Sequence, residues 1–87
     1  MSIIPLSRLE KNACALIHAI MPNTIFGELD PQVSRRLTDL GFSDGMSLTV
    51  IGKGLLGKGP YIVRLGNQSQ FALPEPEASK ILCQVAV

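Results

Sequence analysis

The sequence predicts a mainly β domain, a small five-stranded barrel with one α-helix inserted after the first strand and a short helical turn before the last strand. Five short runs rich in apolar and β-branched residues are separated by Gly, Pro and Asn, which is typical of strands and turns. One stretch, Asp30–Gly45, instead has apolar residues at helical spacing between a start and a stop signal. With 87 residues and 46% hydrophobic content, the chain suits one small core, so we expect residues 1–87 to form a single domain.

The first expected element is a single helical turn within Ile3–Leu9. Pro5 and a Leu-x-x-Leu spacing suit such a turn, which would clamp Leu6 and Leu9 onto the domain. The next run, Ala13–Met21, has no helix cap before it, and its length fits a helix or a strand. We interpret it as a strand with alternating faces. The inward set is then Ala15, Ile17 and Ala19, and the outward set is Cys14, Leu16 and His18.

The predicted helix begins after a loop over residues 22–27. Asp30 is expected to cap the helix by accepting from free N–H groups of the first turn, and Pro31 suits the first helical position. Gly41 can take the left-handed conformation that ends a helix, with Phe42 folding back onto the last turn. The expected buried stripe is Val33, Leu37 and Leu40, and the expected solvated face includes Arg35, Arg36, Thr38 and Asp39.

Four further strands are expected after the helix. Gly66-Asn67 predicts a two-residue hairpin turn, and the prolines of Pro74–Lys80 favour a short helical turn over a longer strand. Alternation turns Tyr61 toward the interior. Together with Ala13–Met21, these strands fit a small SH3-like barrel. The four strands are Ser47–Gly52, Tyr61–Leu65, Gln70–Leu73 and Ile81–Val85.

Composition narrows the classes of partner. A formal charge of +1 gives no basic face for nucleic acid. The two cysteines have no CxxC spacing, which favours reduced thiols in the cytoplasm. The longest apolar run, Ala13–Met21, has about half of the ~20 residues that a membrane-spanning helix needs. We therefore expect a cytoplasmic protein with no signal peptide and no direct membrane insertion.

The glycine-rich segment Gly52–Gly59 contains both Gly-x-Gly-x-x-Gly and Gly-x-x-x-x-Gly-Lys. A phosphate cradle would need a helix after the loop and, for ATP, a Ser or Thr after the Lys. Because Gly59-Pro60 and a strand follow, we expect a hairpin loop and no nucleotide site. The loop has an apolar tip with a basic rim, which can dock a partner or fold back onto its own sheet. This candidate docking surface consists of Lys53, Leu55, Leu56 and Lys58.

Other candidate chemistry is sparse. Cys14 and His18 share a face, but two ligands do not make a metal site, and we expect Cys14 to be semi-buried and His18 to be at the surface. No group is evident near them to orient a nucleophile and base, so we expect no catalytic, cofactor-binding or metal residues and no enzyme activity. Arg35 and Arg36 form a possible basic spot for an acidic partner, although a solvated helix face is the commoner case. Proline-rich ligands are not expected, because the chain lacks Trp and Tyr61 points inward.

The end of the helix carries the motif Arg36-Leu37-x-Asp39-Leu40-Gly41-Phe42-x-x-Gly45, with a short apolar strand directly after it. In this context the motif resembles the signature segment of the FeoA family, small cytosolic accessory proteins of bacterial ferrous iron uptake. The resemblance extends from Leu6 onward, through Gly59-Pro60, Phe71–Leu73 and Glu77–Ile81. The segment between Met21 and Leu29 is longer than the usual connection of the family.

The resemblance implies an SH3-like fold and a non-catalytic, regulatory binding module. The implied partner is the membrane ferrous iron transporter, contacted through its cytoplasmic GTPase domain. Two alternatives stay open, namely a metal-sensing or metal-delivery protein and a stand-alone relative of the C-terminal domain of iron-dependent repressors. This chain has no expected DNA-binding helices, which argues against its being such a repressor by itself. The residues we expect to contact a partner are Lys53, Leu55, Leu56, Lys58, Arg35 and Arg36.

Overall fold

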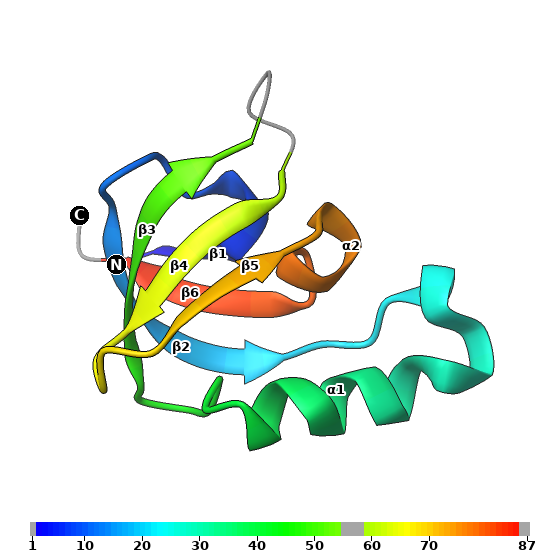
Figure 1. Cartoon of the computed structure of the whole chain (residues 1–87). Coiled ribbons are helices and arrows are strands. Elements are labelled where there is room, and N and C mark those ends of the chain that lie inside the picture. Colours follow the sequence, from blue (N-terminus) through cyan, green and yellow to red (C-terminus); the bar gives the residue numbers. More distant parts are fainter. Residues whose placement is uncertain (1, 55–58, 86–87) are drawn as a thin grey trace.

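The computed structural model describes residues 2–54 and 59–85, whose strands form one six-stranded sheet in the order β1-β6-β2-β3-β4-β5. All neighbouring strands are antiparallel. Figure 1 shows the sheet curling around a common interior, with α1 along one end. The strands are β1 (Ser2–Pro5), β2 (Cys14–Ile20), β3 (Ser47–Lys53), β4 (Tyr61–Leu65), β5 (Gln70–Leu73) and β6 (Ile81–Val85). The helices are α1 (Asp30–Asp39) and α2 (Glu75–Ala78), with 3-10 turns η1 (Leu6–Arg8) and η2 (Thr24–Leu29).

The interior is filled by one side of each long strand. Alternation in β2 buries Ala15 and Ile17 and leaves Cys14, Leu16 and His18 outside, as predicted. The register then shifts between Ile17 and Ala19, so the predicted inward residue Ala19 is only partly buried and Ile20 packs against the core instead. Leu48 and Val50 of β3 face the same interior. Tyr61 is also buried there, which confirms its inward orientation. The buried hydrophobic residues are Leu6, Leu9, Ala15, Ile17, Leu37, Phe42, Leu48, Val50, Tyr61, Val63, Leu65, Leu73, Ala78, Ile81 and Cys83.

The mainly β fold with one main helix and a helical turn before the last strand is confirmed, but the sheet has one strand more than predicted. The extra strand, β1, pairs with β6 from Ser2 opposite Val85 to Pro5 opposite Leu82. It is short and ends in a proline, which an edge strand tolerates and a central strand does not. The expected helical turn follows as η1, with Leu6 and Leu9 buried. The main helix therefore follows the second strand, not the first.

The helix α1 has the predicted start and end but a narrower buried stripe. Leu37 is fully buried and Val33 partly buried, whereas Leu40 is exposed, so the prediction for Leu40 is wrong. The reason lies at Gly41, where φ of +113° turns the chain. The backbone N–H of Phe42 donates to the carbonyl of Leu37, and its ring lies 5.4 Å from that of Phe71. Phe42 thus takes the core position at the helix end.

The turn between β4 and β5 also differs from the prediction. It spans residues 66–69, so it is not a two-residue hairpin. The carbonyl of Leu65 accepts from the N–H of Gln68 at 2.9 Å, and the left-handed residue is Gln68, with φ of +76°. A Cβ at Gly66 would lie 2.4 Å from Oγ of Ser47, so a larger residue there would require the Ser47 side chain to shift.

Candidate functional site

The predicted docking loop leaves the barrel at Lys53, the last residue of β3. Its Nζ lies 5.7 Å from the ring centroid of Tyr61, and the neighbouring N–H of Gly54 donates to the carbonyl of Pro60 at 2.8 Å. After this hairpin stem the chain enters β4, so no helix follows the glycine-rich segment. The other members of the predicted loop surface, Leu55, Leu56 and Lys58, lie outside the described residues.

The two arginines of α1 have different surroundings. Arg36 Nη2 lies 3.8 Å from Glu77 Oε2 of α2 in an exposed ion pair. Arg35 lines an open pocket of about 260 Å³ together with Pro31 and Gln32, and it forms no ion pair within residues 2–54 and 59–85. Figure 1 shows α1 and the end of β3 at opposite ends of the barrel. The structure therefore does not bring Arg35 and Arg36 together with Lys53.

The two cysteines lie in opposite environments. Cys14 is exposed on the outer face of β2, where its Sγ lies 3.3 Å from Thr49 Oγ1, so the prediction of a semi-buried Cys14 is wrong. His18 is exposed on the same strand. Cys83 points into the core, and burial raises the pKa of its thiol to about 12. Across the described part of the chain, no three or more His, Cys, Asp or Glu side chains are grouped to hold a metal ion.

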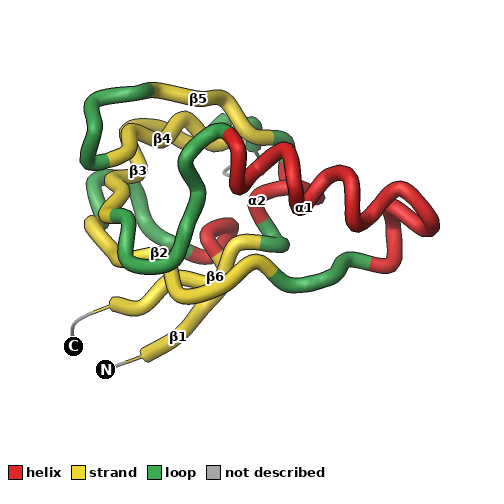
Figure 2. Tube along the Cα trace, turned by 90° about the horizontal axis from the view of Figure 1, so that it is seen from below, coloured by secondary structure: helices red, strands yellow, loops and turns green. Residues whose placement is uncertain are grey.

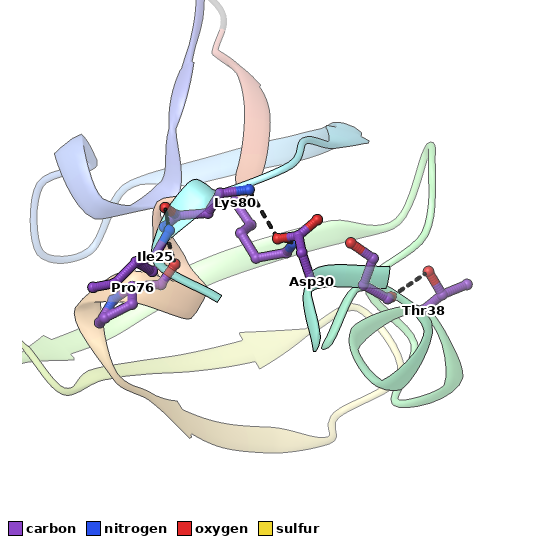
Figure 3. Close-up of polar contacts among 7 residues, drawn as sticks. Ile25, Asp30, Thr38, Pro76 and Lys80 are labelled. Carbon is purple, nitrogen blue, oxygen red and sulfur yellow. Dashed lines mark hydrogen bonds and ion pairs between the residues drawn. The ribbon is translucent and has the colours of Figure 1, made fainter. Parts of the chain in front are cut away.

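A buried ion pair that sequence reasoning missed connects α1 to the corner between α2 and β6. The side chain of Lys80 has no exposed surface, and its Nζ donates to Asp30 Oδ1 at the start of α1 (Figure 3). The same Nζ lies 5.4 Å from the ring centroid of Phe26. Asp30 Oδ1 also accepts from the backbone N–H of Asn23 at 2.8 Å. The hydrogen bond from Lys80, reinforced by that from Asn23, lowers the pKa of the Asp30 carboxyl below its usual value.

These contacts correct the predicted role of Asp30. Its carboxylate does not cap the helix, because Leu29 occupies the cap position and has no side-chain cap hydrogen bond. The carboxylate accepts instead from Lys80, which is 50 residues away in sequence. No local pattern pairs residues at that separation, so the sequence offered no signal for this contact. Asn23 does carry a recognisable sequence signal, because asparagine is a common helix cap. Its Oδ1 accepts from the N–H of Ile25 at 3.1 Å at the start of η2.

Residues 21–40, which we call the arm, extend to one side of the sheet (Figure 2). The arm is joined to α2 and β6 by its own backbone and side chains. The N–H of Met21 donates to the carbonyl of Lys80 at 2.7 Å, and Asn23 Nδ2 donates to the carbonyl of Pro76 at 3.0 Å. The arm also carries four of the six exposed large hydrophobic residues among the described ones. These four are Met21, Ile25, Leu29 and Leu40.

Comparison with known families gives one match over nearly the whole chain. The family model described as the FeoA domain matches residues 4–85. No protein with curated annotation matches the chain. Within the described residues, no helix has the length and apolar character needed to cross a membrane.

Solved structures show the same fold. FeoA of Stenotrophomonas maltophilia, described as a prokaryotic SH3 domain protein complexed with zinc, is 28% identical and superposes with a TM-score of 0.78 over 93% of this chain and 89% of its own. A FeoA-like protein from Clostridium acetobutylicum is 25% identical, with a TM-score of 0.78 over 100% of this chain and 91% of its own. A manganese-dependent transcriptional repressor, 19% identical, gives a TM-score of 0.77 over 97% of this chain but only 42% of its own length. The predicted SH3-like fold is therefore confirmed, and the repressor shares the fold alone.

Proposed function

Because the chain belongs to the FeoA family, which is associated with ferrous iron transport, we propose that it is a non-catalytic accessory module of ferrous iron uptake. Its proposed partner is the cytoplasmic GTPase domain of the membrane iron transporter, and its proposed location is the cytoplasm. The observation that carries the proposal is the match of the FeoA domain to residues 4–85. The S. maltophilia relative is itself described as a candidate activating factor of bacterial ferrous iron transport, which supports the same role.

The polar contacts of the structure support a binding role over a catalytic one. The side chains that the fold brings together connect one element to another, as Lys80 does with Asp30 and Arg36 does with Glu77. Within residues 2–54 and 59–85, the thiol of Cys14 contacts the hydroxyl of Thr49, whereas a thiol nucleophile would need a neighbouring base. Such an arrangement suits a protein that acts by contacting another.

Two separate surfaces are available for that contact. One is the proposed loop surface of Lys53, Leu55, Leu56 and Lys58, of which the structure describes Lys53 at the end of β3. The other is the exposed face of α1, where Arg35 has its charge unpaired within the described residues and can accept an acidic side chain. The end of β3 and α1 lie at opposite ends of the barrel (Figure 1), so we expect a compact partner domain to contact one of the two proposed surfaces, not both.

The test is a titration of isotopically labelled protein with the soluble GTPase domain of the matching transporter, with and without nucleotide. We expect backbone amide shifts confined to one surface, either around Lys53 and the loop or around Arg35 on α1. Amide shifts on both surfaces together would contradict the expectation that the partner contacts one surface alone. Unchanged amides in every nucleotide state would overturn the proposed partner.

A metal-sensing or metal-delivery role is the second candidate, because the S. maltophilia relative was solved with zinc. Cys14 and His18 are exposed on one strand and are the residues that would respond. Micromolar zinc or ferrous iron added to the labelled protein should then shift their amides. If the chemical shifts of these two amides do not change, metal binding by Cys14 and His18 is ruled out. That result would leave the outcome of the GTPase titration unaffected.

A further inference from the structure

The outer half of the arm is held to the barrel in a different way from the inner half. We call residues 22–32 the tip. Within it, η2 has no buried residue, and Ile25 and Leu29 are 68% and 60% exposed. The inner half of the arm contains Leu37, and Phe42 lies just after the arm; neither residue has exposed surface. Because apolar burial is the main force that fixes elements to a core, it holds the inner half firmly and the tip weakly.

What holds the tip is a set of polar contacts that converge on one corner. Asp30 accepts from Lys80, and Asn23 donates both to Asp30 and to the carbonyl of Pro76 (Figure 3). The ring of Phe26 lies against the Lys80 ammonium. The two contacts of Lys80 and the hydrogen bond from Asn23 to Pro76 connect the tip to α2 and its junction with β6. The hydrogen bond from Asn23 to Asp30 lies within the tip.

A buried lysine imposes one geometry on its partners. The desolvation of a fully buried ammonium must be offset by a carboxylate and further contacts in fixed positions, whereas an apolar side chain would accept many arrangements. Lys80 therefore favours the single tip position in which Asp30 and the ring of Phe26 both reach its Nζ. If the tip moves away, the ammonium must become hydrated, so that intermediate positions of the tip are unfavourable.

We propose that Lys80 is a latch that holds the tip closed against the α2–β6 corner. When the Asp30–Lys80 contact breaks, the tip opens by local unfolding and loses its internal hydrogen bonds while the sheet stays folded. In the closed state the exposed side chains of Ile25 and Leu29 are held in a fixed position. In the open state the ammonium of Lys80 and the ring of Phe26 are uncovered together. A partner that binds one of these states more tightly shifts the population toward it.

The test is amide hydrogen exchange of the full chain with Lys80→Met. We expect exchange at least tenfold faster at the hydrogen-bonded amides of Asn23, Ile25 and Phe26, and unchanged exchange at the strand amides of Ile17 and Val50. The matched control is Arg36→Met, which removes the other ion pair between α1 and α2 and should leave the tip amides unchanged. Equal acceleration of tip and strand amides would show that Lys80 only stabilises the core, and would overturn the latch.

A double variant covers the case in which Lys80→Met leaves Asp30 unpaired and unfolds the chain. Asp30→Leu with Lys80→Met replaces the pair by apolar side chains, which often preserves stability. We expect this variant to fold with native strand amide shifts and still to exchange its tip amides at least tenfold faster. Tip exchange at the rate of the unmodified chain in the folded double variant would overturn the proposal.

Discussion

Single glycines determine where the backbone of this fold turns, and Gly41 is the clearest case. Its φ of +113° ends α1, and a Cβ at this position would lie 3.0 Å from Cδ1 of Leu65. Gly45 has a positive φ of +86° as well, but a Cβ there would meet nothing within 4 Å. The two glycines share the backbone requirement, and only Gly41 also depends on close packing.

Gly41→Val should therefore be costly. Backbone strain at a positive φ and a clash with Leu65 together predict a loss of about 2–5 kcal/mol in the free energy of unfolding. The matched control Gly45→Ala carries the backbone strain alone and should lose about 1–2 kcal/mol. Urea unfolding of both variants measures the difference. Equal losses would show that the packing of Gly41 against Leu65 contributes nothing.

At the scale of elements, turn chemistry predicted most of the fold. Pro31 and Gly41 mark the two ends of α1, and alternation in β2 assigned Ala15 and Ile17 to the interior correctly but missed the register shift before Ala19. These signals are local, because they depend on backbone conformation and side-chain period. Where a contact came from a distant segment, the prediction was wrong, as at Asp30, which pairs with Lys80. The strand β1 was missed for the same reason, since its pairing with β6 is long-range.

The candidate site was less accessible to prediction than the fold. Arg35 and Arg36 looked equivalent in sequence, and only the position of α2 pairs Arg36 with Glu77 and leaves Arg35 lining a pocket. Cys14 lies exposed on the outer sheet face, and alternation alone does not reveal whether that face is covered. Sequence patterns give the side of an element on which a residue lies, but not what covers that side.

The start of α1 has a pH dependence that follows from its long-range contact. In the folded protein the pKa of the Asp30 carboxyl is lowered from its ordinary value of 3.8, and the largest cause is the hydrogen bond from Lys80. As pH falls, the unfolded chain takes up this proton first, so the stabilisation is fully present above the ordinary value and is lost as pH falls through the lowered one. Carboxyl NMR should give Asp30 a midpoint below 3.8. Lys80→Met should raise that midpoint, and an unchanged midpoint would contradict the assigned cause.

At the scale of the whole molecule, the barrel separates its two proposed contact surfaces. The stem of the β3–β4 loop and the exposed face of α1 lie at opposite ends (Figure 1). A substitution at one end therefore leaves the other end intact, which allows the two surfaces to be tested independently.

The loop surface makes a direct prediction about partner binding. Leu55→Asp with Leu56→Asp should keep the fold and weaken binding to the GTPase domain at least tenfold, which corresponds to about 1.4 kcal/mol. The reason is that two apolar side chains of the proposed contact are replaced by charged ones. Ile3→Asp with Leu16→Asp is the matched control, since both residues are exposed apolar side chains on other strands. Calorimetric titration of both folded variants measures the affinities. If the loop variant binds as tightly as the control, the loop surface is not the contact.

The position of β6 between β1 and β2 has a consequence for how the chain is made. Both early strands take their hydrogen-bonding partner from Ile81–Val85, so a nascent chain on the ribosome cannot complete the N-terminal side of the sheet until those residues have emerged. We therefore expect the domain to fold in one late step, once Ile81–Val85 are available, and a fragment of residues 1–78 to lack the dispersed amide spectrum of the folded protein. Before that step β1 lacks its partner β6 and β2 can pair on its β3 side alone, so a chaperone that binds extended apolar segments would meet their apolar runs first.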